Sequence, residues 1–504
     1  MKPLTRSQLQ SSNLCQNVGC RILLVLIIIV VSLDFTKSRA LVKSLPGFND
    51  DLPFTLETGY IGVGEYNAVQ LFYYFVESEA NPKRDPLMIW LTGGPGSSVL
   101  SAIIYEIGPF TFNYKNSTME KQTLEINPYS WTKAANIIFL DQPAGAGFSY
   151  AKTPDAYITN DTFATMHAYQ FIRKWFVDHP TFQNNQFYVG ADSYAGIIAP
   201  MIVHEIYNVL NGDEHLIRVL SFEIISANFK TEIETDGYVL GNPGTDTLGE
   251  INSRVQYAHH MALLSDALYK RTKKDCHGEY LNIDPNNTPC INDLQDFHKC
   301  IDNISTAHIL EPICDPSIYD LFRSFKSIEK ASLNFWSLHQ VQKSWCRDCN
   351  YLLIEPWANS KEVREALHIR KEFDDIEWVL WNVSLIFFID QKPISYTHNV
   401  MNNIAYHQRL VHKKCRALVY SGDHDTTVPY LSTLNWIKSL NLSIIDGWRP
   451  WFVEEQIVGY TVKYSNHRYN LVFSTIKGAG HTAPEYKPKE SLNMFTKWLS
   501  NEVL

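Results

Sequence analysis

A serine stands at the centre of a predicted strand–turn–helix, in the segment Gly190–Gly196. The apolar run Phe187–Val189 leads into this segment, and the run Ile197–Val203 leaves it. A sharp turn between a strand and a helix lifts a hydroxyl clear of the sheet, and the helix N-terminus stabilises negative charge that develops beside it. Ser193 is therefore a candidate nucleophile, although a serine in an ordinary loop would give the same pattern when this segment is taken alone.

A base and a carboxylate that could activate this serine follow later in the chain. His481 lies in a glycine loop, and Asp423 and Asp425 follow the apolar run Ala417–Tyr420. Serine, carboxylate and histidine in this order, each after a strand, are typical of the α/β-hydrolase triad. His481 would accept the serine proton as general base, and Asp425 would orient the imidazole. Asp423 is the rival, and we favour Asp425 because Val428–Pro429 follows it at the spacing usual for this turn.

A glycine turn could stabilise the oxyanion that forms when the serine attacks a carbonyl. The predicted strand Leu87–Leu91 ends in Thr92, and Gly93–Gly96 follows. Glycines let the backbone approach a tetrahedral oxyanion closely, so the Gly94 N–H is one expected donor. The N–H of Tyr194, directly after the serine, is the other. The alternative is a plain glycine–proline turn.

Short apolar runs alternate with helical patterns along the chain. The runs are Leu87–Leu91, Ile137–Leu140, Ala417–Tyr420 and Leu471–Ile476. Such runs are typical of strands buried on both faces, and their alternation with helices (163–176, for example) predicts an α/β protein with a mostly parallel sheet flanked by helices. Residues 244–384 interrupt this alternation. We interpret them as a cap insertion in one domain that spans residues 41–504.

The first 40 residues have the pattern of a signal peptide. Arg6 and Arg21 precede the apolar run Ile22–Leu33, and Ser38–Ala40 places small residues at a cleavage site. Cleavage after Ala40 would leave a secreted or vacuolar protein without stable membrane insertion. The net charge of −9 and the lack of a basic cluster argue against a nucleic-acid partner.

Sequons and cysteines agree with the secretory pathway. The sequons begin at Asn116, Asn160, Asn286, Asn303, Asn382 and Asn441. Six of the nine cysteines lie in the predicted insertion, at Cys276, Cys290, Cys300, Cys314, Cys346 and Cys349. This clustering favours disulfides in an oxidising compartment, with a zinc site as the weaker alternative. Cys415 lies in an apolar run and is predicted to be a buried free thiol.

Taken together, these motifs resemble the plant serine carboxypeptidase-like proteins. The segments that carry the resemblance are Lys43–Gly47, Trp90–Gly96, Leu140–Pro143, Asp192–Gly196, Tyr420–Asp425, Trp448–Trp451 and Gly480–Thr482. The resemblance implies an α/β hydrolase with a capping insertion, an acyl-enzyme on Ser193 and no need for a metal or organic cofactor. It leaves the oligomeric state open.

The resemblance also implies where a substrate is held. Carboxypeptidases of this family bind the terminal carboxylate of a peptide with an asparagine before two glycines, a glutamate before the serine and a second glutamate. Here these positions are Thr92 (followed by Gly93), Asp192 and Glu106. Similar departures mark the branch that transfers acyl groups from glucose esters to alcohols. Peptide hydrolysis and acyl transfer both stay open, and the alternative from another class is a glycoprotein that keeps the fold but acts by binding.

Other differences from the family concern cross-links and length. A family cysteine pair is replaced by Ser97 and Trp381, so both ends of that bridge are lost together. Among the remaining cysteines, Cys276–Cys290 is the best single pair. Residues 219–234 and 385–395 are longer than the family usually carries, and we interpret one or both as retained-intron sequence.

Overall fold

The computed structural model describes residues 39–210, 233–314, 347–373, 376–382 and 396–504. Its centre is a 12-stranded sheet in the order β1-β2-β3-β7-β4-β10-β11-β13-β16-β15-β14, with β8 paired to β3. The strands are β1 (Arg39–Val42), β2 (Leu56–Val63), β3 (Val69–Val76), β4 (Leu87–Leu91), β7 (Asn136–Leu140), β8 (Tyr150–Ala151), β10 (Phe187–Asp192), β11 (Gly237–Gly241), β13 (Arg416–Gly422), β14 (Ser443–Val453), β15 (Gln456–Asn466) and β16 (Tyr469–Ile476). The six strands from β7 to β16 are parallel, and antiparallel strands extend both edges.

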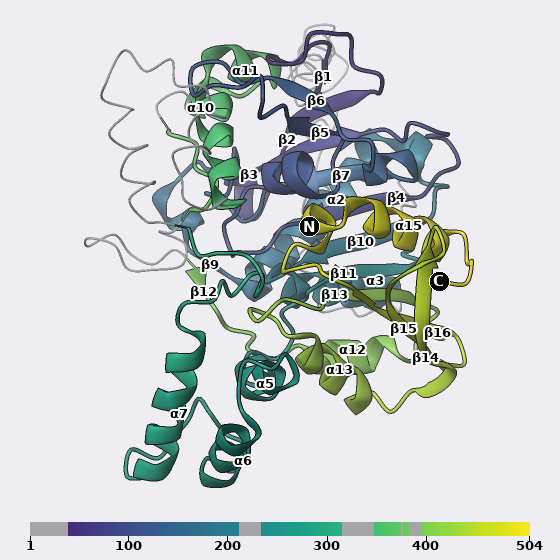
Figure 1. Ribbon diagram of the computed structural model, residues 1–504. Coiled ribbons are helices and arrows are strands. Elements are labelled where there is room, and N and C mark those ends of the chain that lie inside the picture. The colour runs from purple at the N-terminus through teal and green to yellow at the C-terminus, as the bar shows by residue number, and fades with distance from the viewer. Residues whose placement is uncertain (1–38, 211–232, 315–346, 374–375, 383–395) are drawn as a thin grey trace, which may run out of the picture.

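Helices cover both faces of the sheet (Figure 1). One face packs against α2 (Asp161–Asp178), α3 (Ala195–Leu210), α12 (Ile404–Leu410) and α13 (Tyr430–Ser439). The other face packs against α10 (Ile354–Asn359), α11 (Lys361–Ala366), α14 (Ala483–Tyr486) and α15 (Pro488–Leu499). Because both faces are covered, β4 and β10 are buried along their whole length, and the unbroken apolar sequence of β4 predicts this. The predicted α/β class is confirmed.

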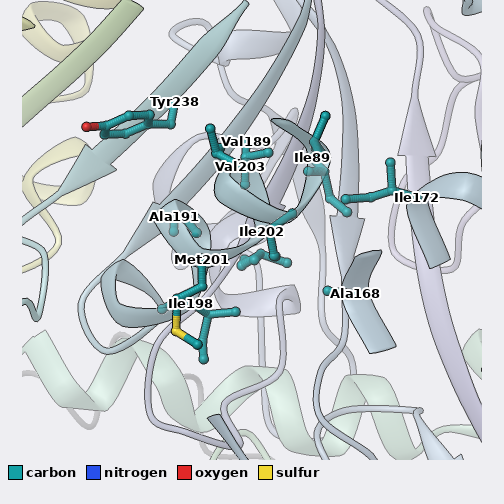
Figure 2. Packing of buried hydrophobic residues seen from close by; sticks show 14 of the residues in the cluster. Ile89, Ala168, Ile172, Val189, Ala191, Ile198, Met201, Ile202, Val203 and Tyr238 are labelled. Carbon is teal, nitrogen blue, oxygen red and sulfur yellow. The ribbon is translucent and has the colours of Figure 1, made fainter. Parts of the chain in front are cut away.

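The packing of α3 fixes the position of the strand that carries the candidate nucleophile. Figure 2 shows Ile198 and Ile202 of α3 in the same cluster as Ala191 and Val189 of β10, and Ile172 of α2 next to Ile89 of β4. The predicted helix 163–176 is α2, which begins two residues earlier because the side-chain oxygen of its N-cap, Asn160, accepts a bond from the Phe163 N–H at 2.9 Å.

The predicted insertion lies between β11 and β13. Its described residues form two separate groups of helices. Helices α5 (Thr247–His260), α6 (Asp266–Asp275) and α7 (Thr288–Ile301) project from the sheet, and they share a small apolar cluster of their own (Figure 1). By contrast, α10 and α11 belong to the main core. The extent of a cap, 244–384, stays a prediction.

The cysteines follow the predicted pattern in part. Cys276 and Cys290 form a disulfide, and Cys314 is also disulfide-bonded. Cys415 is buried and free, as predicted, whereas Cys300 is free and exposed. Cys346 lies outside the described residues. In the described ranges, three or more His, Cys, Asp or Glu side chains are nowhere grouped so that they could hold a metal ion.

Some predictions lie at or beyond the limits of the described chain. Residues 1–38 of the predicted signal peptide, residues 219–232 and residues 385–395 are outside it. The predicted cleavage after Ala40 falls inside β1, where Ala40 pairs with Thr58. Among the described helices, none has the length and apolarity needed to cross a membrane.

Removal of the Cys276–Cys290 disulfide should loosen α6 and α7 without affecting the main core. We expect a double serine substitution to lower the local unfolding free energy by about 2–4 kcal/mol, because the bridge closes a loop between cysteines 14 residues apart. Hydrogen exchange across 261–301 measures this change. Cys300→Ser, also on α7, is the matched control and should change nothing. Faster exchange throughout the sheet would contradict a local role.

Candidate active site

Ser193 occupies the turn between β10 and α3 in a left-handed backbone conformation, with φ of 51°. Three backbone bonds hold it there. The Ser193 N–H donates to the Gly241 carbonyl at 3.0 Å, and the Ser193 carbonyl accepts from Gly196 N–H at 2.9 Å and from Gly244 N–H at 2.8 Å. A non-glycine residue adopts this conformation at a cost, so the surrounding structure must impose it. The predicted strand–turn–helix is confirmed.

The tightest contacts around this turn fall on its two outer glycines. A Cβ on Gly196 would lie 2.5 Å from Pro243 Cβ, and a Cβ on Gly190 would lie 2.6 Å from the Trp90 ring. Ala191 and Ala195, in contrast, are buried without displacing the turn. The alanines that depart from the usual pattern are therefore compatible with the geometry.

The structure brings His481 and Asp425 to Ser193. His481 Nε2 is 2.8 Å from Ser193 Oγ, and His481 Nδ1 is 2.8 Å from Asp425 Oδ2. The imidazole donates from Nδ1 to the carboxylate, so Nε2 is the acceptor for the serine hydroxyl. Asp425 is fully buried, and its Oδ1 accepts bonds from the N–H groups of Thr427 and Val428 at 2.7 and 3.3 Å. These donors fix the orientation of the carboxylate.

The rival carboxylate faces elsewhere. Asp423 Oδ1 is 2.5 Å from His424 Nδ1 and accepts a bond from the Gly478 N–H at 2.7 Å. Asp423 therefore fastens the loop after β13 to the loop after β16, while Asp425 contacts His481.

Asn242, which the sequence analysis missed, also binds Asp425. Its Nδ2 donates to Asp425 Oδ2 at 2.8 Å, and its Oδ1 accepts from the Gly422 N–H at 3.1 Å. Asn242 directly follows β11, so it lies at a strand end like the other site residues. This position is the sequence feature by which Asn242 could have been recognised.

The predicted insertion supplies a second missed contribution. The Ala307 carbonyl accepts from the His481 N–H at 2.8 Å, and the Thr306 carbonyl accepts from the N–H groups of Thr426 and Thr427 at 2.9 and 3.2 Å. A Cβ on Gly480 would lie only 2.3 Å from the Ala307 oxygen. Residues 306–307 thus hold the histidine loop and the aspartate loop together, a contact that no local sequence pattern indicates.

The predicted oxyanion loop lies directly over the serine. A Cβ on Gly93 would be 2.6 Å from Ser193 Cβ and 2.8 Å from the Tyr194 nitrogen, so only glycine fits there. Gly94 has φ of 123°, which strongly favours glycine. Within the described residues, the N–H groups of Gly94 and Tyr194 have no hydrogen-bond acceptor. The two expected donors are therefore next to the nucleophile and unoccupied.

The residues predicted to bind substrate lie on the same side, and some of their polar atoms lack partners. Asp192 Oδ1 and Glu106 Oε2 are buried without a hydrogen-bond partner within the described chain, and the Thr92 side chain hydrogen-bonds to the Asp192 carboxyl. Burial raises the pKa of Asp192 to about 7, against a smaller lowering effect of His481. Burial, and then the negative charge of Asp192, raise the pKa of Glu106 well above its ordinary value. Both carboxyls are thus readily protonated in mildly acidic solution.

His481 has a pKa above its ordinary value. Burial, the largest single effect, would lower this pKa, but the charge and the hydrogen bond of Asp425, together with the charges of Asp192 and Glu250, outweigh it. Because a base accepts a proton only in its neutral form, the negative charges around His481 set the pH above which it can act.

The two positions of the lost family cross-link still face each other. Ser97 and Trp381 form an antiparallel backbone bridge. Beside it, the Ser98 N–H donates to the Leu380 carbonyl at 2.9 Å and the Asn382 N–H donates to the Gly96 carbonyl at 3.2 Å. Backbone hydrogen bonds thus join these segments without a disulfide.

The six predicted glycosylation sites differ in accessibility. Four asparagines are exposed, namely Asn116, Asn286, Asn303 and Asn441. Asn160 and Asn382 are half-buried, and Asn382 Nδ2, the atom to which a glycan would be attached, donates to the Gly145 carbonyl at 2.7 Å. Glycosylation at these sites stays a prediction.

A parallel sheet with a serine turn after β10, an aspartate after β13 and a histidine after β16 defines an α/β hydrolase. The sequence profile of the serine carboxypeptidases matches residues 46–501. Serine carboxypeptidase-like 13 of Arabidopsis thaliana is 44% identical over 482 residues, which cover 96% of this chain and 98% of the relative. Serine carboxypeptidase-like 9 of the same plant is 44% identical over 479 residues, covering 95% and 98%. The chain belongs to the serine carboxypeptidase family.

A solved structure supports the fold. The prohormone-processing carboxypeptidase Kex1(delta)p from Saccharomyces cerevisiae aligns with a TM-score of 0.63 over 93% of this chain and 96% of its own, at 19% identity. The predicted family and the predicted α/β-hydrolase fold are both confirmed.

The two aspartates after β13 can be separated by experiment. We expect Asp425→Asn to slow the labelling of Ser193 by a fluorophosphonate by a factor on the order of 10⁴, because the imidazole loses the carboxylate that fixes its tautomer. Asp423→Asn, the matched control, should slow labelling by less than about tenfold. Equal losses in the two variants would contradict the assignment.

The pH dependence of the same reaction reports the charge next to His481. Asp192→Asn removes a negative charge that raises the pKa of His481, so the labelling rate should rise with pH at a lower midpoint than in the native protein. Asp155→Asn changes an exposed carboxyl and should leave the midpoint in place. A midpoint that moves upward in Asp192→Asn would show that this charge does not act on His481.

Proposed function

We propose that the protein is a serine acyl-transfer enzyme that forms an acyl ester on Ser193. The observation that carries the proposal is the continuous hydrogen-bonded chain from Asp425 through His481 to Ser193 Oγ. In the reaction, the serine oxygen attacks the substrate carbonyl while His481 Nε2 accepts the hydroxyl proton. The N–H groups of Gly94 and Tyr194 stabilise the oxyanion. His481 then donates the proton to the leaving group, and the acyl ester remains on the serine.

The second half of the reaction uses the same groups in reverse order. His481 removes a proton from the acceptor hydroxyl, which attacks the acyl ester. The oxyanion forms again at the same two N–H groups, and collapse of the intermediate returns the proton to Ser193. Water as the acceptor gives hydrolysis, and an alcohol gives a new ester, so the catalytic groups alone serve either outcome.

For the substrate, we propose a glucose ester as donor and an alcohol as acceptor. Thr92 and Asp192 have shorter side chains than the asparagine and glutamate that hold a peptide carboxylate in family carboxypeptidases, and the unpartnered Oδ1 of Asp192 suits a hydroxyl group. The second candidate is release of C-terminal residues from peptides. It is favoured by the raised pKa values of Asp192 and Glu106, because protonated carboxyls can donate hydrogen bonds to a substrate carboxylate in acidic solution.

A paired assay of the purified protein distinguishes the two candidates. We expect faster turnover of a phenolic acid glucose ester with an alcohol acceptor than of a blocked dipeptide, and Ser193→Ala should abolish turnover of both. Faster release of the C-terminal residue would favour the peptidase. If the folded native protein neither reacts with a fluorophosphonate nor turns over either substrate, the binding glycoprotein is the correct alternative.

We further propose that the protein reaches the vacuole or the exterior through the secretory pathway. The signal-peptide pattern of residues 1–40, the disulfide Cys276–Cys290 and the exposed sequons support this route.

A further inference from the structure

A buried carboxylate outside the triad gathers four hydrogen bonds next to the nucleophile turn. Asp161, the first residue of α2, is fully buried. Its Oδ1 accepts bonds from the hydroxyls of Tyr194 and, at 2.8 Å, of Tyr396. Its Oδ2 accepts bonds from the N–H groups of Asn399 and Val400 at 2.7 and 2.8 Å. This set satisfies both oxygens of the buried carboxylate.

The number of protons available in this cluster decides which group donates in each hydrogen bond. Tyr194 gives its only hydroxyl proton to Asp161, so the bond of 2.8 Å between the Tyr194 hydroxyl and His398 Nδ1 requires His398 to be the donor. The two rings are also in contact, because Tyr194 and His398 pack edge to face with centroids 5.1 Å apart. Tyr194 thus has both its hydroxyl proton and its oxygen engaged, and its side chain has one defined orientation.

The cluster joins three segments that are distant in sequence. Tyr396 and Thr397 form β12, which pairs with β9 (Thr159–Asn160) immediately before Asp161. Asn399 Nδ2 also donates to Thr162 Oγ1 at 2.9 Å. The start of α2 and residues 396–400 therefore form one unit, and the only side chain of the nucleophile turn that binds Asp161 within the described chain is Tyr194.

We propose that Asp161 is a positioning residue that aims the Tyr194 N–H at the oxyanion by holding the Tyr194 hydroxyl. The inference rests on the proposed acyl-transfer function, in which this N–H is one of the two oxyanion donors. Tyr194 directly follows Ser193, which has the left-handed backbone conformation. Two restraints therefore orient the backbone of Tyr194: the turn that precedes it and the hydrogen-bonded hydroxyl of its own side chain. Without the second restraint the N–H can rotate away from the oxyanion, which weakens transition-state stabilisation and leaves substrate binding largely unchanged.

Two single-hydroxyl deletions at the same carboxylate oxygen test this proposal. Tyr194→Phe frees the turn, whereas Tyr396→Phe removes a hydrogen bond from the same oxygen of Asp161, together with the contact between the two tyrosine hydroxyls, and leaves Tyr194 attached to Asp161. We expect Tyr194→Phe to lower kcat and the rate of fluorophosphonate labelling about tenfold, with KM within about twofold, since loss of a whole oxyanion donor costs about 10²- to 10³-fold. Tyr396→Phe should stay within about twofold of the native rates.

Thermal melting and pH profiles separate positioning from a general structural role. Both variants should melt at similar temperatures, and the pH midpoint of labelling should not move, because neither change alters the charges around His481. Equal kcat in the two variants, or a loss in Tyr194→Phe that is confined to KM, would overturn the positioning role. If the native protein takes no label at Ser193, the acyl-transfer function itself fails, whichever result the variants give.

Discussion

The left-handed turn at Ser193 is the constraint on which the rest of the site depends. A non-glycine residue in this conformation costs about 1–3 kcal/mol, and it persists only where neighbouring contacts determine it. Here those contacts are backbone bonds to Gly241 and Gly244 and the close approach of Gly196 to Pro243. They tie the nucleophile to the end of the adjacent parallel strand, β11, so the same packing that forms the sheet also presents the serine hydroxyl.

Parallel strands place their carboxyl ends at one edge of the sheet, and this geometry collects the remaining groups. Asn242 follows β11, Asp425 follows β13 and His481 follows β16, and each loop is attached to the next by hydrogen bonds. The insertion completes the arrangement through the carbonyls of Thr306 and Ala307. Residues 306–307, from the segment predicted to be an insertion, thus contribute directly to the position of His481.

The acids of the site have different roles because their surroundings differ. Asp425 is buried, and four hydrogen-bond donors, one of them His481, occupy its carboxylate oxygens. Asp192 and Glu106 are also buried, but each has an oxygen without a partner in the described chain, and burial raises the pKa of both. In the proposed reaction the first carboxylate would stabilise charge on His481, and the other two would complete their hydrogen bonds with a substrate.

The sequence by itself indicated the family and the α/β class, and it predicted Ser193, Asp425, His481 and Gly94 as site residues, because strand-end motifs and glycine turns are local patterns. It also indicated the pair Cys276–Cys290. Tertiary structure alone placed Asn242 on Asp425, residues 306–307 on the histidine loop and Asp161 on Tyr194. These contacts join residues distant in sequence through single hydrogen bonds, and such bonds leave no periodicity or motif in the chain that makes them.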